Sequence, residues 1–118
     1  MSLSPGPART RYDDRRAGPL RTAVDHVVST WEGVERTTVA DCPAYTVRGR
    51  PFAVVTNHGV AVTGLRDRAR ADLRRRYGVA PVALSDPTGE QWEVTPVGSE
   101  DLHGLVSYLR RSYDRTGT

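Results

Sequence analysis

The sequence contains no lysine and no isoleucine, and it has a single cysteine, Cys42, and a single asparagine, Asn57. A lone cysteine excludes an internal disulfide, so a hydrophobic core has to stabilise the fold. Lysine, isoleucine and asparagine use AT-rich codons, and their scarcity indicates a GC-rich genome. All 17 basic residues are arginine, and this codon bias weakens any argument that arginine was selected for the bidentate geometry of its guanidinium group.

Long hydrophobic runs are also missing. No N-terminal apolar stretch resembles a signal peptide, and no segment approaches the roughly 18 apolar residues of a membrane span. We therefore expect a cytoplasmic protein without membrane contact.

Motifs for metals, cofactors and catalysis are absent as well. His26, His58 and His103 do not stand at i,i+4 from one another or in ligand spacing with Cys42. Phosphate-loop, dinucleotide-binding and G-x-S-x-G patterns do not occur. We expect no metal and no cofactor, and the sequence favours a non-catalytic protein. An enzyme that uses His58 or Cys42 stays open as a weaker alternative.

The 118 residues suffice for one ordinary domain. Residues 1–16 are rich in Pro, Gly, Ser, Arg and Asp, which predicts a flexible N-terminal tail because such a segment has little to bury. Residues 17–118 then form a single domain, with a helix starting near Pro19. The net charge of +3 mildly favours polyanionic partners.

The predicted domain begins and ends with a helix, and each of these two helices has one apolar face. A stripe of apolar residues at helical spacing predicts the first helix, which ends before Gly33, and a second stripe predicts the C-terminal helix with Ser99 as its N-cap. The first stripe is Leu20, Val24, Val27, Val28 and Trp31, and the second is Leu102, Leu105, Val106, Leu109 and Tyr113. We expect both stripes to pack on the same face of one sheet.

Short alternating segments between these helices predict an antiparallel meander. The strands are expected at 37–40, 45–47, 52–55, 60–62, 82–84 and 92–94, with short turns between the first four. The segments at 41–43 and 49–51 are expected to be connections. The predicted fold is therefore an α+β two-layer sandwich, with a five- to six-stranded antiparallel sheet and the N- and C-terminal helices on one face.

An arginine-rich helix at residues 66–77 carries the strongest polar signal. It contains six arginines against two aspartates, and its apolar stripe is narrow: Leu65, Ala69, Leu73 and Tyr77. Such a helix, near one sheet edge, could contact phosphates of DNA. The alternative is a solvated helix in an arginine-rich protein. The candidate nucleic-acid contacts are Arg48, Arg50, Arg66, Arg70, Arg74 and Arg75.

Four short segments from residue 20 onward share one further pattern. They are Trp31-Glu32-Gly33-Val34-Glu35, the hairpin from Ala44 to Ala53, Trp92, and Asp101-Leu102 with Leu109 and Ser112-Tyr113. With these segments the sequence resembles the MmcQ/YjbR family. The resemblance implies a CyaY-like fold and the DNA-binding "double wing" role ascribed to that family. The main alternative is an accessory domain that binds a protein or a small molecule and has no nucleic-acid role.

Overall fold

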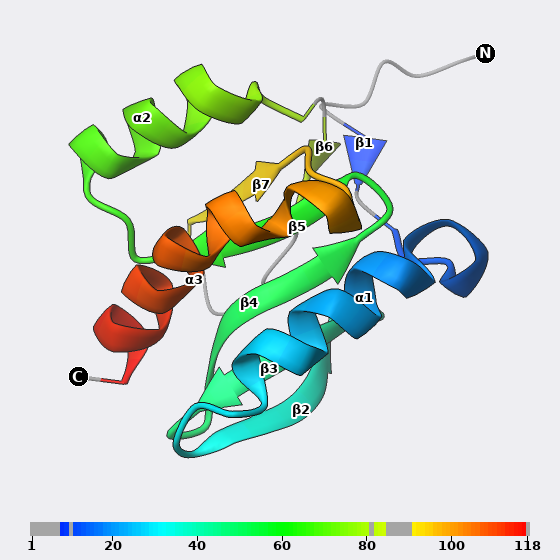
Figure 1. Ribbon diagram of the computed structural model, residues 1–118, viewed down its shortest axis with the longest axis vertical. Helices are drawn as coiled ribbons and strands as arrows, with labels where there is room; N and C mark the ends of the chain where they lie inside the picture. Colours follow the sequence, from blue (N-terminus) through cyan, green and yellow to red (C-terminus); the bar gives the residue numbers. More distant parts are fainter. Residues whose placement is uncertain (1–7, 10, 81, 85–90, 118) are drawn as a thin grey trace, which may run out of the picture.

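A five-stranded antiparallel sheet organises the chain (Figure 1). The computed structural model describes residues 8–9, 11–80, 82–84 and 91–117, and within them this sheet and three α-helices give an α+β fold. The order across the sheet is β2-β3-β4-β5-β7. The strands are β2 Val34–Val39, β3 Cys42–Val47, β4 Arg50–Thr56, β5 Gly59–Thr63 and β7 Trp92–Thr95. The predicted antiparallel meander is thus confirmed for β2 to β5.

Two-residue turns connect β2 to β3 and β3 to β4. Ala40 and Asp41 have φ values of 52° and 63°, and Arg48 and Gly49 have φ values of 54° and 79°. Positive φ at both central residues matches the right-handed twist of the flanking strands. The turns are tighter than the sequence suggested: residues 42–43 and 50–51, which we expected in connections, already belong to strands.

A β-bulge in β4 turns Phe52 toward the helices. Tyr45 pairs with Ala53 while Thr46 pairs with Pro51, so Phe52 is the extra residue and has no partner on β3. Ser112 supplies the missing contacts: its hydroxyl donates to the Phe52 carbonyl at 2.6 Å and accepts from the Thr63 backbone N–H at 3.1 Å. The buried Ser112 hydroxyl therefore forms hydrogen bonds with backbone groups of two strands, β4 and β5, and fixes its helix against them.

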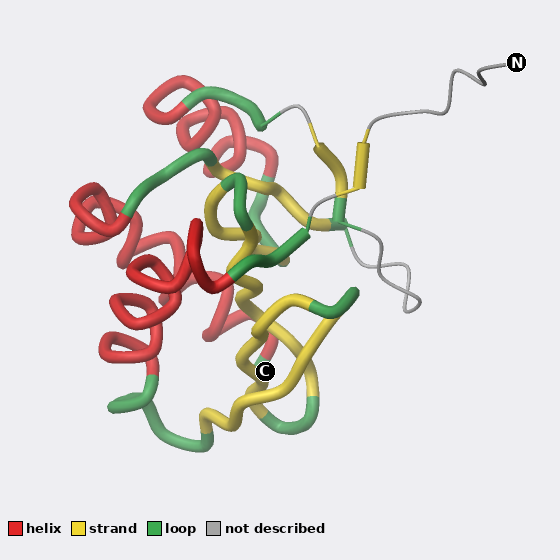
Figure 2. The backbone as a smooth tube through the Cα atoms, turned by 90° about the vertical axis from the view of Figure 1, so that its right-hand side faces the viewer, coloured by secondary structure: helices red, strands yellow, loops and turns green. Residues whose placement is uncertain are grey.

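The helices α1, Asp14–Val28, and α3, Leu102–Thr116, lie on one face of the sheet, and the side view in Figure 2 shows the helices gathered on that side. The predicted stripes are confirmed as core-facing except at Val106, which is half-buried and does not belong to the core cluster. Val27, Trp31 and Tyr113 pack against the core but are only partly buried. Trp31 follows the end of α1 instead of lying in it, and its ring stands 6.2 Å from that of Phe52. Sequence reasoning missed the buried Ala17, Tyr108 and Ser112.

The predicted boundary of the N-terminal tail is wrong, because α1 begins at Asp14 instead of near Pro19. Asp13 caps the helix by accepting from the Arg15 N–H at 2.9 Å. The turn after β4 holds this segment, since Asn57 accepts from the Asp13 N–H and donates to the Arg11 carbonyl, both at 2.8 Å. Further upstream, β1 Ala8–Arg9 pairs in parallel with β6 Val82–Ala83. The remainder of the predicted tail, 1–7 and 10, lies outside the described residues.

The arginine-rich helix is α2, Asp67–Tyr77, and it packs beside α3 over the edge strand β7. Its stripe faces the domain as predicted: Leu65, Ala69 and Leu73 belong to the same core as α1 and α3. A Cβ atom at Gly104 would lie 2.3 Å from the Tyr77 hydroxyl, so a side chain there would require the Tyr77 ring to shift. Before α3, residues 99–101 form a 3-10 turn, η1 Ser99–Asp101, and Ser99 does not act as the N-cap of α3.

The opposite face of the sheet is built from small residues. Its buried members are Cys42, Ala44, Val54, Ala61, Val94 and the nearby Ala80. Tyr12, Val82 and Trp92 pack against them at the margins. None of the helices in the described part of the chain is long and apolar enough to cross a membrane.

Candidate functional site

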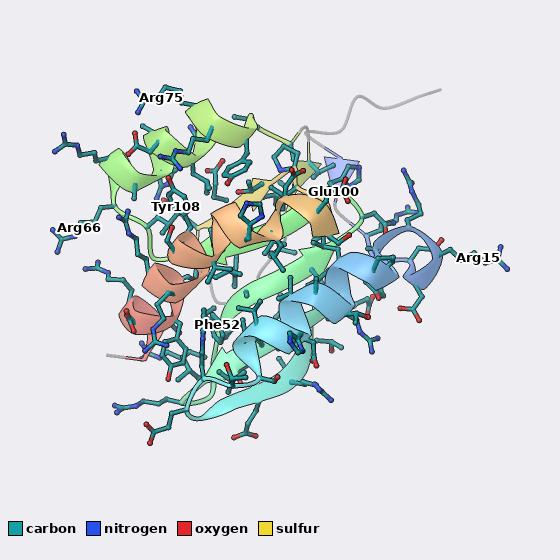
Figure 3. All side chains as sticks on the ribbon, in the orientation of Figure 1. Arg15, Phe52, Arg66, Arg75, Glu100 and Tyr108 are labelled. Carbon is teal, nitrogen blue, oxygen red and sulfur yellow. The ribbon has the colours of Figure 1, made fainter. Side chains whose placement is uncertain are left out.

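The α2 arginines proposed from the sequence are held by carboxylates to different degrees. Arg75 pairs with Asp72 one turn earlier, and Arg70 lies 4.0 Å from Asp67. No ion pair is recorded for Arg66 among the described residues, and Figure 3 shows it projecting away from the domain, as Arg75 does. Of the four candidate contacts on this helix, Arg66 is therefore the one without an ion pair in the described part of the chain.

Arg74 has a structural role. Its Nε and Nη2 atoms donate to the two carboxylate oxygens of Glu93 at 3.0 and 2.8 Å, and the Glu93 side chain is only 8% exposed. These hydrogen bonds and the carboxylate charge raise the pKa of Arg74 above its ordinary value. Removal of Arg74 would leave a buried carboxylate without its partner. We therefore assign Arg74 to the attachment of α2 to β7.

The hairpin arginines lie at the β3–β4 turn but border different hollows. Arg48 occupies the turn itself and borders a hollow of about 300 Å³ with Glu32 and Asp114. Arg50 begins β4 and borders a hollow of about 430 Å³ on the side of Arg115. The structure thus brings Arg50, but not Arg48, to a surface dominated by positive charge.

Two neighbouring hollows lie where β5 leaves the sheet toward α2. The first, about 340 Å³, is lined by Gly64, Leu65, Arg66, Ala69, Arg111, Asp114 and Arg115. The second, about 430 Å³, is lined by Gly49, Arg50, Pro51, Thr63, Gly64, Arg115 and Thr116. Gly64 and Arg115 line both. We call the two hollows together the Gly64 groove.

Four arginines from three parts of the fold meet at the Gly64 groove. Arg50 comes from β4 and Arg66 from the N-cap of α2, whereas Arg111 and Arg115 come from the last turns of α3. One acidic residue, Asp114, lines the described walls, and it pairs with Arg110 at 3.3 Å. Three net formal charges remain.

The peptide dipoles add little to this charge. The first turn of α2 and the last turn of α3 both border the Gly64 groove, so the positive end of one helix dipole opposes the negative end of the other. The arginine side chains therefore set the electrostatic character of the groove.

Gly64 allows α3 to approach the chain at this point. Its φ is +70°, and a Cβ atom there would lie 3.1 Å from the Cβ of Arg115. A side chain at position 64 would strain the backbone and press against α3. The glycine therefore helps to place Arg115 between the two hollows.

Arg111 and Arg115 are not among the candidate contacts that the sequence predicted. Their spacing of four residues places them on one face of α3. That spacing was the available signal. The position of Gly64 and Arg50 against the same face depends on tertiary structure.

Of the two residues considered for an enzymatic role, Cys42 is poorly suited to act as a nucleophile. Cys42 is fully buried, and burial, with a smaller contribution from Asp41, raises the pKa of its thiol. A raised pKa makes the nucleophilic thiolate scarce at neutral pH. His58 lies in the β4–β5 turn with a buried Nδ1 atom that has no hydrogen-bond partner in the described structure. The described residues contain no cluster of three or more metal-ligating side chains.

Comparisons with known proteins do not favour any one of the functions considered above. No family model matches the chain, and no curated protein or solved structure matches it at a significant level. The resemblance to the MmcQ/YjbR family stays a prediction.

Proposed function

We propose that the protein is a non-catalytic domain that binds nucleic acid through the phosphates, with the Gly64 groove as its contact surface. The observation that carries this proposal is the convergence of Arg50, Arg66 and Arg115, together with Arg111, on two adjoining hollows. Guanidinium groups form bidentate hydrogen bonds with phosphate oxygens, and several of them on one surface release counterions when a polyanion binds.

The proposal moves the contact surface away from the outer side of α2. Arg70 and Arg75 have aspartate partners, and Arg74 is needed by the buried Glu93. A phosphate would have to compete with these carboxylates, whereas no ion pair is recorded for Arg66, Arg111 or Arg115 in the described residues. Of the six residues proposed from the sequence, Arg50 and Arg66 keep the role of principal contacts.

We propose for the fold the two-layer sandwich of the CyaY and YjbR type. Three features support it: the antiparallel order of the sheet, the position of α1 and α3 on the same face, and the insertion of α2 before the last strand. This proposal is independent of the ligand.

A salt titration tests the nucleic-acid proposal. Binding of a fluorescein-labelled DNA is followed by anisotropy over a range of salt concentrations for the wild type and for Arg66→Gln/Arg111→Gln/Arg115→Gln. We expect the slope of log affinity against log salt to fall by about two to three units in the triple variant. The matched control carries the same charge change on the outer side of α2, at Arg68, Arg75 and Arg76.

The two triple variants have distinct expected results. The control variant should keep most of the wild-type slope, because its side chains lie away from the groove. An equal loss in both variants would show that only net charge matters and would remove the groove as the site. Absence of binding by the wild type at physiological salt would favour the accessory-domain alternative.

One observation supports that alternative. A hollow of about 280 Å³ between α1 and β2–β3 is lined by Tyr12, Arg21, Asp25, Arg36, Tyr45 and neighbouring residues. Its volume is near the lower end of ligand pockets, roughly 300–1,000 Å³. However, Arg36 and Asp25 already pair with each other at 2.6 Å, so its strongest polar groups are engaged.

A further inference from the structure

The two halves of the Gly64 groove differ in chemistry. The first hollow has the apolar side chains of Leu65 and Ala69 in its wall, together with the guanidinium-bearing side chains of α3 and Arg66. The second has Arg50, Arg115 and the hydroxyl of Thr116. An apolar wall joined to a basic, hydroxyl-bearing one fits a ligand with a flat apolar part and an anionic part.

A DNA or RNA duplex does not present such a ligand. Its bases are stacked inside the helix and show only their edges in the grooves, while its phosphates lie on a convex surface. A duplex would contact protruding arginines and leave the first hollow empty. A single strand, in contrast, exposes whole base faces, which proteins bind by stacking beside a basic path for the backbone.

Arg111 is positioned to stack. Its guanidinium carbon lies 5.6 Å from the ring centroid of Tyr108, which is buried in the core with only 5% exposure. This cation–π contact holds the guanidinium group near the Tyr108 ring, and Arg111 also lines the first hollow. A planar guanidinium group of this kind can cover a base face, which an ammonium group cannot do.

On the premise of the proposed nucleic-acid function, we infer that the Gly64 groove binds a single strand. One unpaired base occupies the hollow beside Leu65, Ala69 and Arg111, and the adjoining phosphate lies on Arg50 and Arg115. Arg66 borders the same hollow and faces the backbone on its outer side. The inference needs no rearrangement of the sheet, because both hollows are present in the structure.

The test compares three labelled ligands of equal length: an oligothymidylate, an abasic oligonucleotide with the same phosphates, and a duplex. Stacking contributes about 1–3 kcal/mol per base, so the oligothymidylate should bind the full-length protein at least about fivefold more tightly than the abasic strand. It should also bind more tightly than the duplex. The abasic strand should keep the salt dependence of phosphate binding.

The outcomes separate the inference from the proposed function. Equal affinity for the oligothymidylate and the abasic strand, or tighter binding of the duplex, would overturn the inference while phosphate binding stands. Failure of all three ligands to bind would overturn both. Competition by thymidine 5′-monophosphate tests whether the groove binds a free nucleotide instead of a strand. If the monophosphate bound as tightly as the oligothymidylate, the ligand would be a free nucleotide and the single-strand inference would be overturned.

A conservative variant examines the stacking role. Arg111→Lys keeps the charge at an exposed position but loses the planar group, so it should lose most of the preference for the oligothymidylate over the abasic strand while the salt slope stays unchanged. Arg75→Lys, on the outer side of α2, is the matched control and should retain the preference. Retention of the preference in Arg111→Lys would contradict the assigned position of the base.

Discussion

The helices α2 and α3 both carry several arginines, yet they differ in how many of these side chains pair with carboxylates. On α2, carboxylates engage Arg70, Arg74 and Arg75. On α3, Arg110 pairs with Asp114 and lies 5.1 Å from the Trp31 ring, whereas Arg111 and Arg115 border the Gly64 groove. Among the described residues no ion pair involves Arg68 or Arg76 of α2, or Arg111 or Arg115 of α3. The two helices therefore leave equal numbers of arginines unpaired, and the difference is that those of α3 border the Gly64 groove.

This difference follows from how each helix is anchored. Only Ala69 and Leu73 are buried among the residues of α2, so its apolar contact is small. The Arg74–Glu93 ion pair adds a second attachment of α2 to β7. The buried face of α3 is broader: Leu102, Leu105, Tyr108, Leu109 and Ser112. Because apolar packing and Ser112 already fix α3, its remaining arginines are available for a ligand.

The largest effect is expected from Leu105→Ala in α3. Leu105 is fully buried between α3 and the sheet, so its truncation should lower the free energy of unfolding by about 2–5 kcal/mol. The matched change in α2, Leu73→Ala, should cost less, because a helix at the sheet edge can close over the vacated space. Urea denaturation of both variants measures the difference, and a larger loss for Leu73→Ala would reverse the comparison of the two anchors.

A smaller effect is expected from Ser112→Ala. The variant leaves the Phe52 carbonyl and the Thr63 N–H without their shared partner at the bulge, which should cost about 1–3 kcal/mol. Ser107→Ala, on the exposed side of the same helix, is the control and should leave the urea midpoint unchanged. If the two variants unfold at the same urea concentration, the serine does not fix α3 to the sheet.

The third effect concerns the α2 arginines themselves. Arg74→Ala should lower the urea midpoint because Glu93 stays buried without its partner, while Arg75→Ala should leave it unchanged because the Arg75–Asp72 pair is exposed. Arg74→Ala/Glu93→Gln should recover part of the loss, since the glutamine carries no charge. Equal midpoints for Arg74→Ala and Arg75→Ala would refute the structural role of Arg74.

The order of elements could be predicted because local patterns specify it. Leu20 and Val24, like Leu102 and Leu105, repeat at helical spacing, and short turns enforce antiparallel pairing of β2 to β5. The start of α1 was misplaced, since its docking depends on Asn57, more than forty residues away. The pairing of Arg74 could not be predicted for the same reason, because Glu93 lies nineteen residues away on β7 and meets Arg74 only where α2 packs on that strand.

The smallest effect is expected from single carboxylate changes. They distinguish two reasons why the outer α2 arginines are not expected to contribute to oligonucleotide binding. Asp114→Asn removes the acidic residue that lines the Gly64 groove and leaves Arg110 unpaired. We expect slightly tighter oligonucleotide binding and a salt slope steeper by up to about one unit. Asp72→Asn frees Arg75 in the same way on α2, but away from the groove.

If an arginine contributes to binding only when it lies at the Gly64 groove, Asp72→Asn should leave both the affinity and the salt slope unchanged, because Arg75 then faces solvent without a ligand beside it. If an arginine contributes whenever it has no carboxylate partner, Asp72→Asn and Asp114→Asn should strengthen binding equally, since each raises the net charge by one unit. Anisotropy titrations of both variants over the same salt range separate these results. Equal strengthening would extend the contact surface back along α2, and a steeper slope for Asp72→Asn than for Asp114→Asn would transfer the site to α2 altogether.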